Sequence, residues 1–170
     1  FGNTDLCVSK LCQGTAFRHL PRIDDPIVIK VLKQAFDLGV TFFDSAIAYR
    51  WGGAERALGQ ALDGNREDAV ICTKVPIFLE SGEQMAYNSD YLRSAVEGSL
   101  KRLKTDYLDL FLLHHVDEYT PVNEQCDGMQ ELVEKGLIRY WGLSNHDTKK
   151  TTAFLRYARI AGIEEYYNIA

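Results

Sequence analysis

Four polar side chains lie at or just after the ends of three short, β-rich stretches of the chain. Asp44, Lys74 and His114 each end one stretch, and Tyr49 follows Asp44 by five residues. A phenol has an ordinary pKa of about 10, but a nearby ammonium favours the phenolate. We therefore expect Lys74 to make Tyr49 a better proton donor, with Asp44 holding the ammonium in an ion pair. His114 can hydrogen-bond and orient a substrate oxygen, so the four groups together indicate a site for carbonyl reduction.

Carbonyl reduction also needs a hydride, which none of these side chains can supply, so the site requires a cofactor. Ser144 and Asn145 directly follow a further β-rich stretch. Their hydroxyl and amide groups suit the carboxamide of a nicotinamide. The same two residues could instead cap the helix that follows them, and both interpretations stay open.

A metal site is the main alternative for the histidines. His114 and His115 are followed closely by Asp117 and Glu118, and imidazoles and carboxylates are common metal ligands. Adjacent residues on a strand point to opposite faces, so the two histidines cannot readily chelate one ion. We therefore expect no metal here and place His115 in the loop or behind the reacting groups.

Three aromatic residues in expected loops could line an apolar substrate pocket: Phe17, Trp51 and Phe78. Aromatic residues in loops also pack against the rest of a protein, so both roles stay open for each. Tyr49 taken alone would more often be a packing residue, and it is its spacing from Asp44 that indicates chemistry.

The elements that carry these residues form a regular alternation of β-rich and amphipathic helical stretches. This rhythm is typical of repeated βα units around a parallel sheet. Strands are expected over residues 11–15, 40–44, 69–74, 107–114, 138–143 and 166–169, with a further hairpin strand considered over 6–8. Helices are expected over residues 26–38, 54–62, 90–103, 122–135 and 148–161, the last of them ended by Gly162.

The place of the polar residues selects between two α/β folds. They fall at or just after the ends of the first five strands, as in a parallel (β/α)8 TIM barrel, whose site lies at the C-terminal face. A doubly wound nucleotide-binding sheet should show G-x-G-x-x-G after its first strand, and residues 14–17 do not match it. We predict that residues 1–170 form one barrel domain, incomplete at its C-terminus, with about six strands and five helices.

Composition excludes several other classes of protein. Of the 170 residues, 46% are hydrophobic and 25% charged, with a net charge of −5, which is ordinary for a globular domain. No basic stripe indicates nucleic-acid binding, and no apolar run approaches the roughly 20 residues that cross a bilayer. The four cysteines, Cys7, Cys12, Cys72 and Cys126, stand apart without a CxxC pair. Cys12 and Cys72 lie in apolar, strand-like stretches where we expect them to be buried, which indicates reduced thiols in a cytoplasmic protein.

Several stretches together resemble the aldo-keto reductase family over essentially the whole chain. They are Gly14–Thr15, residues 39–49, Glu55 with residues 58–62, Thr73–Lys74, residues 100–114 and residues 142–145. Members of that family usually prefer NADPH over NADH and act on aldehydes and ketones. The resemblance therefore implies a small-molecule aldehyde or ketone substrate and NADPH as the cofactor, with NADH as the second option.

The resemblance also implies roles for individual residues. Tyr49 would be the acid, with Lys74 and Asp44 as the pair that lowers its pKa. His114 would be the imidazole that orients the substrate, and Ser144 and Asn145 would contact the carboxamide. The residues expected at the cofactor are Gly14, Thr15, Asp44, Ser144 and Asn145.

The sequence departs from the family in two places. Family members continue through a seventh and an eighth strand, whose loops hold the cofactor phosphates, and this chain ends before them. A Gln usually lies shortly before a Tyr-Asn pair near the sixth strand, whereas here Glu164, Glu165 and Tyr166 precede Tyr167 and Asn168. We therefore expect the chain to be truncated at its ends and to lack residues between Gly162 and Tyr166, with the short loop from Phe17 to Arg22 as a second place of missing residues.

Two other functions stay open. The chain could be an NADPH-binding regulatory module resembling the potassium-channel β subunits, which would bind the cofactor tightly and turn over slowly. It could also be a barrel lyase or isomerase that uses the same acid and imidazole without net oxidation of nicotinamide. The sequence leaves the oligomeric state open.

Overall fold

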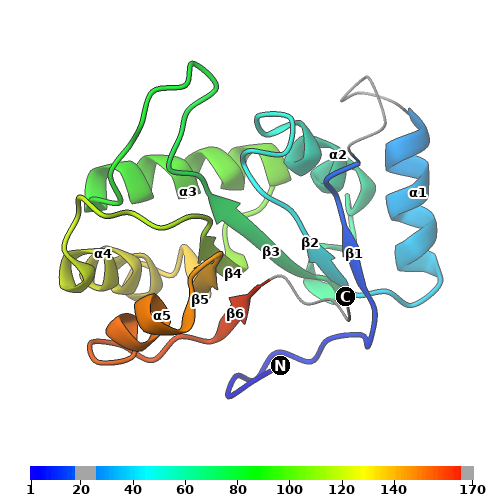
Figure 1. The fold of residues 1–170 in the computed structure, drawn as a ribbon. Helices are drawn as coiled ribbons and strands as arrows, with labels where there is room; N and C mark the ends of the chain where they lie inside the picture. Colours follow the sequence, from blue (N-terminus) through cyan, green and yellow to red (C-terminus); the bar gives the residue numbers. More distant parts are fainter. Residues whose placement is uncertain (18–25, 166–170) are drawn as a thin grey trace, which may run out of the picture.

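The computed structural model describes residues 1–17 and 26–165 and shows six parallel strands separated by five α-helices (Figure 1). The strands are β1 (Cys12–Gly14), β2 (Phe42–Asp44), β3 (Val70–Val75), β4 (Leu108–Leu113), β5 (Ile138–Ser144) and β6 (Gly162–Glu164). The helices are α1 (Pro26–Asp37), α2 (Gly53–Ala61), α3 (Ser89–Leu103), α4 (Val122–Glu134) and α5 (Thr148–Phe154), with a short 3-10 helix, η1 (Arg66–Asp68), before β3. Within the described residues, no helix is long and apolar enough to span a membrane.

The strands pair in chain order, so neighbours in the sheet are also neighbours in sequence. Every pair is parallel: Asp44 of β2 pairs with Cys72 of β3, and Ser144 of β5 pairs with Glu164 of β6. The carboxyl ends of all six strands therefore meet along one edge. This arrangement is an open part of a parallel β/α barrel, which confirms the expected fold class.

The main core lies between the sheet and its helices. Side chains alternate between the two faces of a strand, and Phe111 and Leu113 of β4 point into the main core without any exposure. Leu110 and Leu112 belong to a smaller cluster with Cys72 on the other face. Because β4 is covered on both faces, its sequence is almost continuously apolar rather than alternating.

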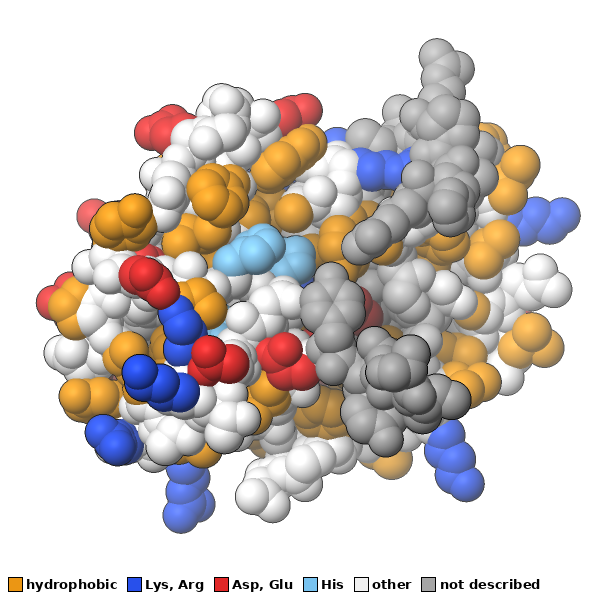
Figure 2. All heavy atoms as spheres, in the orientation of Figure 1, with side chains coloured by type: hydrophobic (Ala, Val, Ile, Leu, Met, Phe, Trp, Pro, Cys, Tyr) orange, Lys and Arg blue, Asp and Glu red, His pale blue; other side chains and the backbone are white. Residues whose placement is uncertain are grey.

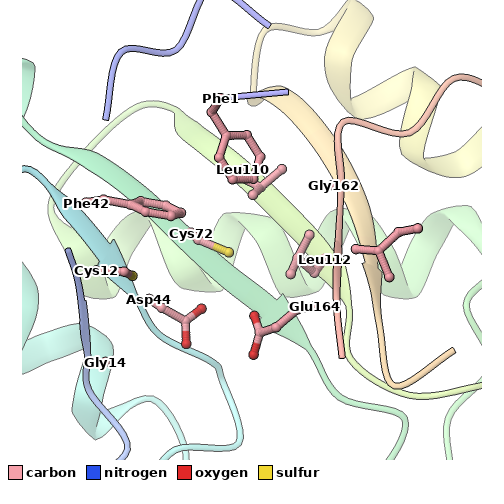
Figure 3. A pocket seen from close by; sticks show the side chains of 11 residues that line it. Phe1, Cys12, Gly14, Phe42, Asp44, Cys72, Leu110, Leu112, Gly162 and Glu164 are labelled. Atoms are coloured by element: carbon pink, nitrogen blue, oxygen red, sulfur yellow. The ribbon is translucent and has the colours of Figure 1, made fainter. Parts of the chain in front are cut away.

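The inner face of the sheet encloses a cavity of about 370 Å³ (Figure 3). Most of its lining is apolar, and Phe1 from the start of the chain packs edge-on against Phe42, with ring centroids 5.6 Å apart. The carboxylates of Asp44 and Glu164 line the same cavity. We refer to this space as the inner cavity.

Two expectations for the N-terminal part are wrong. Residues 6–8 do not form a hairpin strand. The chain next to them is held by side-chain hydrogen bonds of Ser9 instead of a strand ladder: the Thr41 amide donates to Ser9 Oγ at 3.0 Å, and the Ser9 amide donates to Thr41 Oγ1 at 3.1 Å. Cys12 is exposed rather than buried, because β1 has a neighbouring strand on one side only. Cys72 is buried as expected.

The C-terminal elements also differ from expectation. The fifth helix ends at Phe154 instead of near Ala161, and Gly162 begins β6 instead of ending the helix. The chain already pairs with β5 at this point, because the Ala161 amide donates to the Trp141 carbonyl oxygen at 2.8 Å. A Cβ atom on Gly142 would lie 2.2 Å from the Gly162 carbonyl oxygen, so only glycine fits at Gly142. The expected sixth strand over residues 166–169 lies outside the described residues.

Candidate active site

The ends of β2 and β3 bring together three of the expected reacting groups. The Lys74 ammonium donates to Asp44 Oδ1 at 2.5 Å and to the Ser45 carbonyl oxygen at 2.9 Å. It also donates to the Tyr49 hydroxyl at 3.4 Å. The side chain of Lys74 has no exposed surface, so these contacts replace its hydration. The structure thus joins Asp44, Tyr49 and Lys74 as the sequence analysis expects.

A tight turn after β2 positions Tyr49. The Ile47 amide donates to the Lys74 carbonyl oxygen at 3.1 Å, which holds the loop against β3. Arg50, Trp51 and Gly52 then all adopt positive φ angles of 56°, 50° and 82°. Only glycine adopts this conformation without cost, so the turn stores backbone strain beside the tyrosine. The Gly52 amide donates to the Ile47 carbonyl oxygen at 2.7 Å and closes the turn.

His114 follows β4 and faces the tyrosine. Its ring meets the Tyr49 ring edge-on, with centroids 5.9 Å apart. Burial, together with the charges of His115 and Lys74, lowers the pKa of His114 from 6.5 to about 3. The imidazole is therefore neutral at neutral pH, so it can donate a hydrogen bond to a substrate oxygen without carrying a charge.

The net effect on the acid differs from expectation. Burial raises the pKa of Tyr49 above its ordinary value of 10, and Lys74 lowers it only in part. Asp44 and Glu164 raise it further. Tyr49 is therefore fully protonated at neutral pH and can act as a donor, but Lys74 does not make it more acidic than a free phenol.

Lys74 itself stays charged. Burial lowers its pKa, but Cys72, Asp44 and Glu164 act in the opposite direction and raise it above its ordinary value. Two of these groups make ionic contacts with the ammonium: Asp44 Oδ1 lies 2.5 Å and Glu164 Oε2 3.3 Å from Lys74 Nζ. A permanent ammonium thus lies beside the Tyr49 hydroxyl.

A second pocket, of about 610 Å³, opens at the carboxyl edge of the sheet, and we call it the mouth. Figure 2 shows histidine side chains near the centre of this face with acidic side chains close by. The residues that line the mouth are Ala48, Tyr49, His114, His115, Ser144, Asn145, Glu164 and Glu165. The tyrosine expected to donate the proton, the neutral imidazole and the two residues expected at the carboxamide therefore share one pocket.

Ser144 and Asn145 are held in place beside His114. The Asn145 amide group donates to the His114 carbonyl oxygen at 2.8 Å and to Ser144 Oγ at 3.1 Å. The capping alternative for these residues is wrong, because Asp147 caps α5 by accepting from the Lys150 amide at 2.8 Å. A nicotinamide fits the donor set at this position, since a hydroxyl and an amide converge there with Tyr49.

The other residues expected at the cofactor are placed differently. Gly14 and Asp44 line the inner cavity, and a Cβ at Gly14 would meet no atom of the described residues within 4 Å apart from those of its chain neighbours. Thr15 is buried, and its hydroxyl donates to Ser45 Oγ at 3.0 Å. The Thr15 side chain is therefore engaged within the protein, and it lines neither pocket.

His115 lies at the mouth, and one of the three aromatic candidates, Phe78, lies beside it. His115 lines the mouth, and its ring stacks on that of His114 with centroids 4.4 Å apart. Phe78 meets the His115 ring at 6.5 Å and is 46% exposed, so it can touch a substrate. Trp51 is partly exposed in the turn after Tyr49, whereas Phe17 packs against the main core.

Glu164 is a residue of the site that the sequence does not indicate. In the sequence it is only a departure from the family pattern, yet its carboxylate lies 3.3 Å from Lys74 Nζ and lines both pockets. The local sequence pattern does not indicate where β6 begins. Because β6 begins at Gly162, Glu164 pairs in register with Ser144.

One group of potential metal ligands occurs among residues 1–17 and 26–165. Asp44, Cys72 and Glu164 offer ligand atoms within 4.8 Å of one another. The Lys74 ammonium already contacts both carboxylates and supplies the positive charge there. His114 and His115 do not belong to this group.

The fold and the site define a protein of the β/α barrel class with a tyrosine hydroxyl, an ammonium and a neutral imidazole near its strand ends. The chain belongs to the aldo/keto reductase family, whose model matches residues 10–170. It is 33% identical over 149 residues to the aldo-keto reductase YhdN of Bacillus subtilis (strain 168), covering 86% of this chain and 45% of that protein. It is 32% identical over 154 residues to a probable voltage-gated potassium channel subunit beta of Oryza sativa subsp. japonica, covering 89% and 47%.

Solved structures give the same result. An aldo-keto reductase of Bacillus halodurans in its holo form superposes with a TM-score of 0.89 at 32% identity, over 98% of this chain and 56% of that one. An aldo-keto reductase of Klebsiella pneumoniae in complex with NADPH superposes with a TM-score of 0.74 at 34% identity, over 89% and 50%. The chain spans about half the length of the curated relatives that it matches.

Proposed function

We propose that the protein reduces a small aldehyde or ketone to an alcohol with NADPH, and that Tyr49 gives the proton. One observation carries the proposal: the Tyr49 hydroxyl lies 3.4 Å from the Lys74 ammonium, in the same pocket as His114. A protonated phenol beside a fixed positive charge and a neutral imidazole suits an oxygen that gains negative charge during reduction.

The roles of the side chains follow from their protonation states. His114 donates a hydrogen bond to the carbonyl oxygen and holds it toward the Tyr49 hydroxyl. Tyr49 transfers its proton to that oxygen as negative charge develops on it, and the Lys74 ammonium stabilises the phenolate that remains. Asp44 keeps the ammonium in position through the 2.5 Å contact. When bound, the nicotinamide supplies the hydride that reduces the carbonyl carbon.

Ser144 and Asn145 are proposed to hold the carboxamide of the cofactor, and Gly14 with Asp44 to border it. NADPH is the proposed cofactor because a Klebsiella pneumoniae relative at 34% identity was solved in complex with it, and NADH is the second option. The free thiols of the chain also suit a reducing compartment, so we propose a cytoplasmic location.

A regulatory module is the second candidate. The probable potassium channel subunit beta of Oryza sativa, at 32% identity, favours it. Such a module would keep the cofactor site and bind NADPH tightly, but it would turn over slowly. The two candidates therefore differ in the rate of reduction and not in cofactor binding.

Two successive measurements on the full protein distinguish the candidates. NADPH binding is first titrated by fluorescence, and a panel of aldehydes is then added while the nicotinamide absorbance is followed. The reductase requires saturable NADPH binding and aldehyde-dependent loss of nicotinamide absorbance. Binding without turnover would favour the regulatory module. Turnover of a substrate without loss of nicotinamide absorbance would point to a lyase or isomerase, and absence of NADPH binding would overturn both nicotinamide-dependent candidates.

A further inference from the structure

Glu164 stands at the boundary between the two pockets. It ends β6 and lines both the inner cavity and the mouth. The backbone carbonyl oxygen of Glu164 accepts a hydrogen bond from the backbone N–H of Asn145 at 3.1 Å, which fixes the backbone of Glu164 against the end of β5. Figure 3 shows the carboxylates of Glu164 and Asp44 pointing toward one another across the inner cavity.

Lys74 contacts both carboxylates. Its Nζ lies 2.5 Å from Asp44 Oδ1 and 3.3 Å from Glu164 Oε2, and it also reaches the Tyr49 hydroxyl. One ammonium therefore contacts two carboxylates and the hydroxyl of the proposed acid. Any negative charge added to this group weakens the attraction that Lys74 exerts on a developing phenolate.

We propose that Glu164 is a positioning residue of the reaction: as the second carboxylate on Lys74, it sets how strongly the ammonium acts on the Tyr49 hydroxyl. The inference rests on the proposed function, because it assigns Tyr49 as the acid. It extends that function by giving a role to a residue at which this chain departs from the family pattern.

The electrostatic balance supports this role. Glu164 raises the pKa of Tyr49, so it works against the part of the Lys74 effect that lowers that pKa. Burial and the neighbouring charge of Asp44 raise the pKa of Glu164 itself above its ordinary value of 4.5. The titratable and charged groups that face this cluster from the neighbouring strands and loops are Cys12, Asp44, Tyr49, Cys72, Lys74 and His114.

Removing the Glu164 carboxylate should leave the fold intact. The side chain is 47% exposed, and Lys74 keeps its contacts to Asp44 and to the Ser45 carbonyl oxygen. Glutamine has the same shape without the charge. Glu165 provides a matched control, because it is the next residue, lines the mouth and makes no ion pair with Lys74 among the salt bridges of the described residues.

The test compares Glu164→Gln, Glu164→Asp and Glu165→Gln in the full protein. The pKa of Tyr49 is measured by carbon NMR on protein labelled at the tyrosine ring carbon, and the resonance is assigned by its loss in Tyr49→Phe. The basic limb of the pH profile of kcat/KM for aldehyde reduction is recorded in parallel. Denaturant unfolding confirms that each variant folds.

Glu164→Gln should lower the pKa of Tyr49 and move the basic limb of kcat/KM to lower pH. Glu164→Asp, which keeps the charge, should lie closer to the native values, and Glu165→Gln should leave the pKa of Tyr49 in place. Equal shifts in both Gln variants, or no shift in either, would overturn the role of Glu164. A shift of the Tyr49 pKa in a protein that reduces no aldehyde would instead overturn the proposed reaction, because the NMR result does not depend on turnover.

Discussion

The Lys74 ammonium lies 2.5 Å from the Asp44 carboxylate, so a side chain at the end of β3 is tied to one at the end of β2. The link is possible because the two strands are adjacent and parallel and therefore end at the same edge of the sheet. Since Lys74 also reaches the Tyr49 hydroxyl, this ion pair places a charge next to the proposed acid.

Loss of the Lys74 charge should impair proton donation. Lys74→Met removes the charge and the hydrogen bond that lower the pKa of Tyr49, so that pKa should rise further. General-acid catalysis contributes typically about 100-fold or more, and we expect kcat to fall by about that factor. The measurement is steady-state reduction of an aldehyde with saturating NADPH. Lys30→Met, at an exposed position of α1, serves as the control. An unchanged kcat in Lys74→Met would contradict the role of the ammonium.

The buried carboxylate of Glu55 should contribute strongly to the stability of the fold. Its carboxylate is fully buried and accepts from Thr73 Oγ1 at 2.7 Å and from Arg102 Nε at 2.5 Å. Breaking a buried ion pair at one partner costs about 3–5 kcal/mol, so Arg102 left without its carboxylate should make Glu55→Gln strongly destabilising. Denaturant unfolding measures the loss.

The matched control is Asp63→Asn, which removes one member of an exposed ion pair with Lys104 at 4.0 Å. Exposed pairs add little to stability because water and salt screen them. A loss in Glu55→Gln no larger than that in Asp63→Asn would show that the buried pair does not stabilise the fold.

Stability should depend on pH through His114. Its folded pKa of about 3 lies below the ordinary 6.5, so the unfolded chain binds a proton that the folded protein does not. The stabilisation is therefore complete above about pH 6.5 and is lost progressively as the pH falls toward 3. His114→Gln should flatten this part of the curve of unfolding free energy against pH. The remaining slope would include His115 and His146, and at its acidic end Asp117, whose pKa values are also lowered. An identical slope in the variant would exclude His114 as a cause.

The sequence predicted the site best where the groups lie on neighbouring strands. Asp44 and Lys74 end β2 and β3, and the alternation of strands and helices was enough to bring them together. The net pKa of Tyr49 could not be predicted in the same way, because its sign depends on how much of the phenol is buried. Burial at a loop position depends on tertiary contacts that local patterns do not contain.

The sequence failed at the last strand for a similar reason. Gly162 has the usual appearance of a residue that ends a helix, and only the close packing of Gly142 on its carbonyl shows that it begins β6. That error of a few residues hid Glu164, whose contact with Lys74 depends on the register of β6 against β5.

The measurement that tests the central claim most directly is the reaction of the Tyr49→Phe protein. The phenyl ring keeps the packing against His114 but has no proton to give. We predict that NADPH binding, followed by fluorescence, stays close to native while aldehyde-dependent oxidation of NADPH is nearly abolished. Reduction at the native rate in Tyr49→Phe would show that another group gives the proton, and the proposed mechanism would be wrong.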